Sequence, residues 1–225
     1  KRYVRYRPLQ PTDAETFARW WTAGPDLTIN EGGVRYANFV TTLFIPQRSI
    51  LFGWPLLFFA LALLVESFKK GAADSSSPRL WLRAGLIGSL LPLVHSHSFA
   101  VLAFCAVVMA ARGDRSASLA FLRGVLPLAL PAILFMAARN SLSPASFLAW
   151  QPGFDGGGAH PIKYWLMNAG LFLPLVAAGL ASARGSSVRA SFAAPFIALF
   201  ALANLFRLSP WIWDNMKFLA PAHAG

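Results

Sequence analysis

Long apolar stretches without any acidic or basic residue restrict the fold of this chain more than any other feature. A membrane-spanning helix needs about 20 mostly apolar residues. Stretches that reach or approach this length fill most of the chain after residue 48. They are residues 49–65, 84–111, 124–138, 164–183 and 190–206. The pattern predicts an all-α protein, a polytopic transmembrane helical bundle.

The composition agrees with a membrane protein. Apolar residues make up 56% of the 225 residues and charged residues 13%, against about 25% charged in soluble domains. This balance excludes intrinsic disorder. The net charge of +11 does not predict a nucleic-acid partner, because the basic residues lie mostly in short loops between apolar stretches; the expected partner is the lipid bilayer. The only cysteine, Cys105, excludes an intrachain disulfide and a cysteine metal cluster.

Basic residues in the loops predict the topology. They form three groups, at 69–83, 112–123 and 184–189, and the positive-inside rule places all three in the cytoplasm. The stretch 84–111 must then cross twice, as a hairpin of two short helices that turns near 92–97, where a proline and two histidines interrupt the apolar pattern. The prediction is about six membrane segments, including this short helical hairpin.

Three regions follow from this topology. Residues 1–45 are expected to form an extracytoplasmic segment with a short interfacial helix, and residues 46–217 the transmembrane helical domain. Residues 218–225 are interpreted as a truncated tail, because the sequence resembles a piece of a longer polypeptide.

Cationic side chains gather on the predicted outer face. Arg48, Arg207 and Lys217 could hold a phosphate, because arginine forms paired hydrogen bonds with phosphate oxygens and lysine supplies a compact charge. The alternative is that each reaches the headgroups of the lipids with no further role.

Two histidines, His95 and His97, lie at the predicted turn on the same face. In a turn they could converge as hydrogen-bond donors, act as an acid and base pair near neutral pH, or bind a metal, although no HExxH spacing accompanies them. The alternative is that they bond to backbone groups at a buried turn.

Aromatic and acidic residues close the predicted outer face. Trp211 and Trp213 could stack on a sugar ring or belong to the interfacial aromatic belt. Asp214 could pair with Lys217, orient a substrate hydroxyl or bind a divalent cation. Asp214, His95 and His97 are the candidate catalytic residues. No metal site and no cofactor is predicted, with the divalent cation as the alternative.

Several ordered motifs together resemble a group of bacterial polytopic membrane proteins that is similar to the C-type superfamily of glycosyltransferases. The motifs are PQR at 46–48, LPLVHSHS at 91–98, WQPG at 150–153, NLFR at 204–207 and PWIWDNMK at 210–217. The resemblance covers roughly residues 30 to 220, and the last motif is its most specific part.

The resemblance implies a multi-pass protein of the bacterial inner (plasma) membrane that transfers a sugar from a polyprenyl-phosphate donor at the extracytoplasmic face. It also implies a catalytic carboxylate in a first outer loop, which we expect upstream of Lys1. The candidates that the resemblance implies for contacts with the donor phosphate and the acceptor are Arg48, His95, His97, Arg207, Asp214 and Lys217. A transporter or flippase, and a non-catalytic membrane subunit, are the alternative hypotheses.

Overall fold

The structure is a computed structural model of the whole chain. It describes residues 29–31, 34–36, 48–70, 74–111, 115–139, 148–152, 162, 165–166, 172–182, 187–209 and 215–224. The predicted interfacial helix before residue 45 lies outside these ranges.

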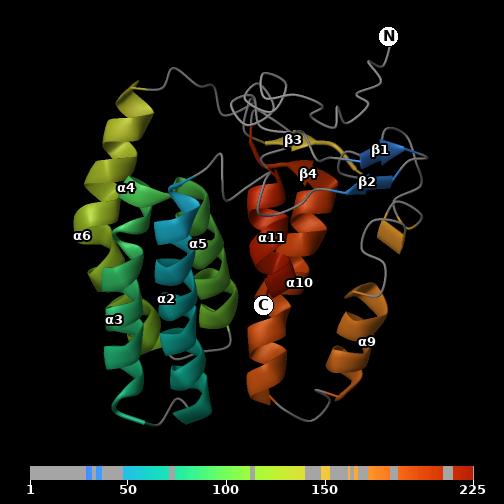
Figure 1. Ribbon diagram of the computed structural model, residues 1–225. Helices are drawn as coiled ribbons and strands as arrows, with labels where there is room; N and C mark the ends of the chain where they lie inside the picture. Colours follow the sequence, from blue (N-terminus) through green and yellow to red (C-terminus); the bar gives the residue numbers. More distant parts are fainter. Residues whose placement is uncertain are drawn as a thin grey trace, which may run out of the picture.

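Helices dominate the described residues (Figure 1). They are α2 (Ile50–Lys70), α3 (Ser77–Gly88), α4 (Leu91–Val94), α5 (Ser96–Ala110), α6 (Arg115–Arg139), α9 (Phe172–Ser182), α10 (Ser187–Leu205) and α11 (Met216–Ala224). Prolines lie inside α2, α6 and α10, which membrane helices tolerate because neighbouring groups satisfy the freed backbone atoms.

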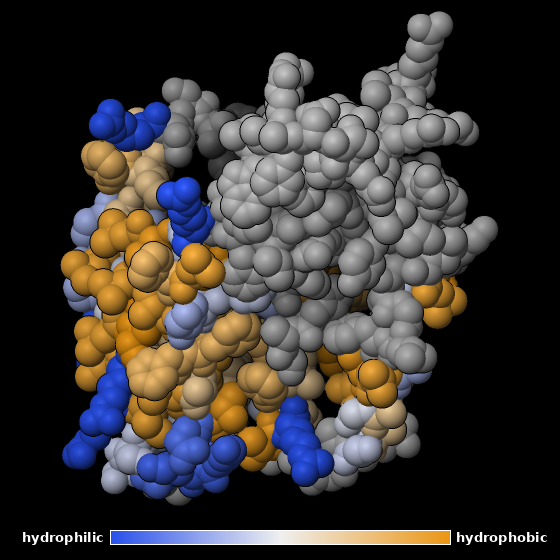
Figure 2. Space-filling view, viewed as in Figure 1, coloured by the Kyte–Doolittle hydropathy of each residue, from blue (hydrophilic) through white to orange (hydrophobic). Residues whose placement is uncertain are grey.

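Three of these helices are long and apolar enough to cross a membrane: α2, α6 and the Val188–Leu205 part of α10. Figure 2 shows a hydrophobic band on one face between hydrophilic residues at its lower and upper ends. Both features are compatible with the predicted membrane protein. The total of about six membrane segments stays a prediction.

The apolar stretch 84–111 is interrupted as predicted, but it forms three helical pieces and not two: the end of α3, the short helix α4 and helix α5. Figure 1 shows the chain reversing direction between α3 and α5, with α4 at the upper end. His95 separates α4 from α5 in an extended conformation, with φ −155° and ψ 91°. The turn region thus runs from residue 89 to His95, so it overlaps the predicted range 92–97 but begins before it.

Two small antiparallel sheets add to the helices that the sequence analysis expected. They are formed by β1 (Ile29–Glu31) with β2 (Val34–Tyr36), and by β3 (Ala149–Trp150) with β4 (Phe206–Arg207). Where a chain leaves a helix its backbone groups need new partners, and pairing with a second segment satisfies them. The β3–β4 pair lies at the upper end, directly after α10 (Figure 1).

Helices α3 and α6 pack through glycines. A Cβ atom added at Gly124 would lie 2.5 Å from the carbonyl oxygen of Leu82, and one added at Gly85 would collide with the carbonyl oxygen of Phe121. The absence of side chains at both positions lets the two backbones approach closely, as is common between membrane helices.

A buried core lies between α2, α3, α5, α6, α10 and α11. Trp81 is its largest fully buried side chain. Its indole Nε1 donates to Ser67 Oγ at 2.9 Å, and Ser67 Oγ lies 2.5 Å from Ser77 Oγ. This buried polar cluster, at the lower end of the bundle, therefore pairs its own donors and acceptors.

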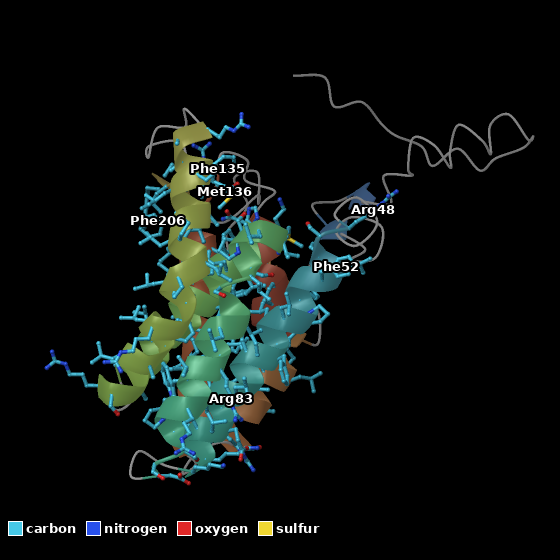
Figure 3. The ribbon with its side chains drawn as sticks, turned by 90° about the vertical axis from the view of Figure 1, so that its left-hand side faces the viewer. Arg48, Phe52, Arg83, Phe135, Met136 and Phe206 are labelled. Carbon is cyan, nitrogen blue, oxygen red and sulfur yellow. The ribbon has the colours of Figure 1, made fainter. Side chains whose placement is uncertain are left out.

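The two ends of the bundle carry different sets of cations. Lys69, Lys70 and Arg83 lie at the lower end, with Arg83 labelled in Figure 3. Arg48 lies at the upper end, just before α2. The described part of the predicted cytoplasmic groups thus shares one end, whose side of the membrane stays a prediction.

Candidate functional site

An open pocket of about 480 Å³, here called the upper pocket, lies at the upper end of the bundle. Three segments that are distant in the sequence form it: the start of α2, the turn between α4 and α5, and the start of α11. Its lining residues are Arg48, Ser49, Pro92, Val94, His95, Ser96, His97 and Lys217. Four of the candidate site residues, Arg48, His95, His97 and Lys217, are therefore brought together.

Arg48 reaches the upper pocket from the beginning of α2. Its carbonyl oxygen accepts a hydrogen bond from the Leu51 backbone N–H at 3.1 Å, and the Ser49 carbonyl accepts from Gly53 at 2.8 Å. These bonds form the first helical turn and fix the point at which Arg48 leaves the helix. Figure 3 shows Arg48 above Phe52 at the upper end of α2.

His95 joins the two helices of the turn. Its backbone N–H donates to the Leu91 carbonyl at 2.7 Å and ends α4, while its own carbonyl accepts from Phe99 at 3.3 Å and begins α5. The imidazole Nδ1 also accepts from the Ser98 backbone N–H at 3.3 Å. Serine, threonine, aspartate and asparagine are the usual residues at this capping position, so a histidine here is uncommon.

A glycine makes room for this imidazole. A Cβ atom added at Gly53 would lie 2.5 Å from His95 Cβ and 3.1 Å from its Cγ. The backbone of α2 therefore passes directly against the His95 side chain, which is only 6% exposed. The role of Gly53 could not be predicted from the sequence, because nothing in the spacing of the chain relates it to His95.

His97 is held by aromatic contacts. Its ring centroid lies 5.6 Å from that of His95 and 5.4 Å from that of Phe218 in α11, the second pair in an edge-to-face arrangement. Phe218 is buried. The contact fixes α11 against the turn, so the two histidines and Lys217 occupy one side of the bundle end.

Asn215 positions Lys217. It is fully buried, its Oδ1 accepts from the Leu208 backbone N–H at 2.9 Å, and its Nδ2 donates to the carbonyls of Ala203 and Phe206, both at 2.8 Å. These bonds tie the start of α11 to the end of α10 and to β4. The sequence analysis noted Asn215 only as part of the last motif and assigned it no role.

Arg207 does not line the upper pocket. It lies in β4, paired with Ala149 of β3, and its Nε is buried without a hydrogen-bond partner among the described residues. The structure therefore does not bring Arg207 into the pocket that Arg48 and Lys217 line, and its contact with a phosphate stays a prediction. Asp214, Trp211 and Trp213 lie outside the described residues.

Positive charges of two kinds lie at the upper pocket. Among its described lining residues are the cations Arg48 and Lys217 and no carboxylate. Helices α2, α5 and α11 all begin at this pocket, and each helix N-terminus contributes a partial positive charge. The arrangement favours an anion.

The pKa of His95, which lies between helices rather than within one, is lowered to about 4. Burial is the main cause, and the positive charge of Lys217 is the second. His95 is therefore a neutral imidazole at physiological pH.

Within the described part of the chain, no group of three or more histidine, cysteine, aspartate or glutamate residues is arranged to hold a metal ion. Asp214, on which the divalent-cation alternative depends, is not among those residues. Comparisons with known protein families, with curated proteins and with solved structures found no match to this chain.

Proposed function

We propose that this chain is an integral membrane glycosyltransferase-like protein, which transfers a sugar from a polyprenyl-phosphate donor at the outer face of the bacterial inner membrane. The observation that carries the proposal is the convergence of Arg48, His95, His97 and Lys217 on the upper pocket, at the start of three helices. A phosphate is the leaving group of such a donor, and pocket cations would stabilise the charge that develops on it.

Apolar side chains beside the upper pocket favour an anion with a hydrocarbon tail. Leu93, between two lining residues, is 67% exposed, and Phe52, about one turn beyond Arg48, is 69% exposed. A polyprenyl phosphate presents the same combination, with its phosphate at the pocket and its chain along the apolar surface.

In the proposed reaction an acceptor hydroxyl attacks the anomeric carbon of the donor. The bond from that carbon to the phosphate oxygen breaks, and polyprenyl phosphate leaves with the electron pair. The hydroxyl proton passes to a carboxylate, for which Asp214 is the candidate in this chain. Arg48 and Lys217 would bind the phosphate throughout.

The test is an assay of the full chain in lipid nanodiscs with a radiolabelled polyprenyl-phosphate sugar. We expect transfer to water or to an added acceptor, lowered about tenfold to a hundredfold by Arg48→Ala, since one charged contact to phosphate is lost. Arg139→Ala is the matched control, because Arg139 is another exposed arginine at the upper end, placed over the Phe135 ring. Absence of transfer by the native chain contradicts the proposal.

A transporter or flippase is the second candidate, favoured by the interruption of the helix at His95. Broken membrane helices whose N-termini face an anionic substrate are typical of secondary transporters. Uptake of a labelled phosphosugar, or scrambling of a fluorescent lipid, by proteoliposomes that contain the purified chain would favour this function over transfer.

A further inference from the structure

The two nitrogens of the His95 imidazole have different surroundings. Nδ1 lies 3.3 Å from the Ser98 backbone nitrogen and 2.8 Å from Ser98 Oγ. A backbone N–H can only donate, so Nδ1 must present a lone pair. A neutral imidazole whose Nδ1 accepts carries its proton on Nε2.

Because Nδ1 of His95 accepts from Ser98, the Nε2–H group is the remaining donor of the imidazole. It is buried and has no hydrogen-bond partner among the described residues. The His95 side chain lines the upper pocket and is only 6% exposed. An unpaired buried N–H costs free energy that a bound acceptor would recover. A lining residue of the pocket therefore carries a donor that has no acceptor among the described residues.

The charged and titratable groups around His95 oppose a second proton on its ring. Arg48 faces the pocket from the start of α2, His97 from α5 and Lys217 from α11. Burial and Lys217 both lower the pKa of His95. A further positive charge here would face two fixed cations and three helix N-termini.

We propose that the upper pocket binds a phosphate group through the neutral Nε2–H of His95 together with Arg48 and Lys217, so that His95 is a fixed hydrogen-bond donor and not the base of a reaction. The inference rests on the proposed function, from which it takes phosphate as the occupant. A lipid phosphate and a free phosphate share this chemistry, and the experiment separates them.

The binding experiment uses the full chain in nanodiscs with two probes, inorganic phosphate and a polyprenyl phosphate without sugar, followed by native mass spectrometry. We expect His95→Leu to weaken binding about tenfold or more, since one hydrogen bond to a charged ligand is lost. His95→Gln, whose amide can donate near the Nε2 position, should retain binding within about threefold. Binding of the lipid probe alone assigns a lipid phosphate, and binding of inorganic phosphate alone assigns a free anion.

Equal binding by the native chain and His95→Leu overturns the inference, as does binding of neither probe by the native chain. A pH series separates donor from base: between pH 5 and 8, native chain and His95→Gln should show parallel binding curves. A curve of the native chain that departs from that of His95→Gln near pH 6.5 contradicts a neutral donor.

A spectroscopic measurement does not depend on the stability of the His95 variants in a binding assay. In a chain labelled with ¹⁵N-histidine, the signal missing from His95→Gln should show the neutral form protonated at Nε2, and a signal protonated at Nδ1 overturns the inference. Binding of polyprenyl phosphate without sugar transfer by the native chain would reject the proposed function and leave the inference standing.

Discussion

Both ends of the helical bundle bury polar side chains, and the two buried clusters that contain Trp81 and His95 differ in how completely their described atoms are paired. At the lower end, Ser67, Ser77 and Trp81 bond to one another. At the upper end, one nitrogen of His95 bonds to Ser98 and the other has no partner among the described residues. A closed polar cluster joins helices, whereas an open one retains the capacity to bind a ligand.

The cations of the two ends also have different surroundings. Lys69 lies 3.8 Å from Glu66 on the exposed surface, and Arg189 donates to the Ser182 carbonyl at 3.3 Å. Arg48 and Lys217 instead line a pocket with two imidazoles. The basic residues at the two ends thus have different expected roles. Those at the lower end are expected to orient the chain in the membrane, and Arg48 and Lys217 at the upper end to bind an anion.

The largest expected effect comes from removing both pocket cations. The double variant Arg48→Ala, Lys217→Ala should bind polyprenyl phosphate about a hundredfold more weakly, because two charged contacts are lost. The double variant Lys69→Ala, Lys70→Ala, at the lower end, should bind as the native chain does. Titration of both variants in nanodiscs checks this contrast, and equal losses would remove the distinction between the ends.

A methyl group beside His95 should have the next largest effect. In Gly53→Ala the new Cβ meets His95 Cβ at 2.5 Å, so the ring must move; we expect the free energy of unfolding to fall by about 1–3 kcal/mol and phosphate binding to weaken. Gly179→Ala in α9 is the control, because no described atom lies within 4 Å of the added Cβ. Thermal unfolding in detergent and phosphate titration measure both effects, and unchanged behaviour of Gly53→Ala would contradict this packing.

Breaking the lower cluster should affect stability alone. Ser67→Ala leaves the buried Trp81 Nε1–H without its acceptor, which we expect to lower the free energy of unfolding by about 1–2 kcal/mol. Phosphate binding at the other end should remain within experimental error. A loss of binding in Ser67→Ala, measured with the same titration, would mean that the two ends are coupled.

The smallest effect concerns pH. The pKa of His95 is about 4 in the fold and 6.5 ordinarily, so between these values the unfolded chain binds a proton that the folded chain does not. Stability should therefore be fully present above pH 6.5 and fall as the pH decreases towards 4. Only a small loss is expected from pH 7 to 6. When melting temperature is plotted against pH between 6 and 7, the slope for the native chain should differ from that for His95→Gln. Identical slopes would contradict the lowered pKa of His95.

Much of the architecture could be predicted from the sequence because hydrophobic helices have a strong local signal. The apolar stretch after residue 48 becomes α2, and the proline and histidines near 92–97 mark the observed turn. The grouping of Arg48, His95, His97 and Lys217 followed from topology, since residues at the same end of successive helices lie on one face of a membrane protein.

Contacts between segments that are distant in the chain could not be predicted from the sequence. Nothing in the chain pairs Gly53 with His95, or β3 with β4, because both contacts depend on how helices pack and not on local spacing. Topology grouped Arg207 with the pocket cations. In the structure Arg207 lies in the two-residue strand β4, paired with Ala149 of β3, and does not line the pocket. Asn215 gave no signal of its threefold bonding, since any asparagine in a turn has the same local pattern.

The origin of the upper pocket in three distant segments has a consequence for biogenesis. During synthesis, α2 and the α4–α5 turn are translated well before α11. Arg48 and His95 are therefore present before Lys217 can complete the pocket. Full affinity for an anionic ligand is therefore expected only once α11 has docked through Asn215 and Phe218. A nascent chain that stops before α11 is therefore expected to bind the anionic ligand more weakly than the complete chain does.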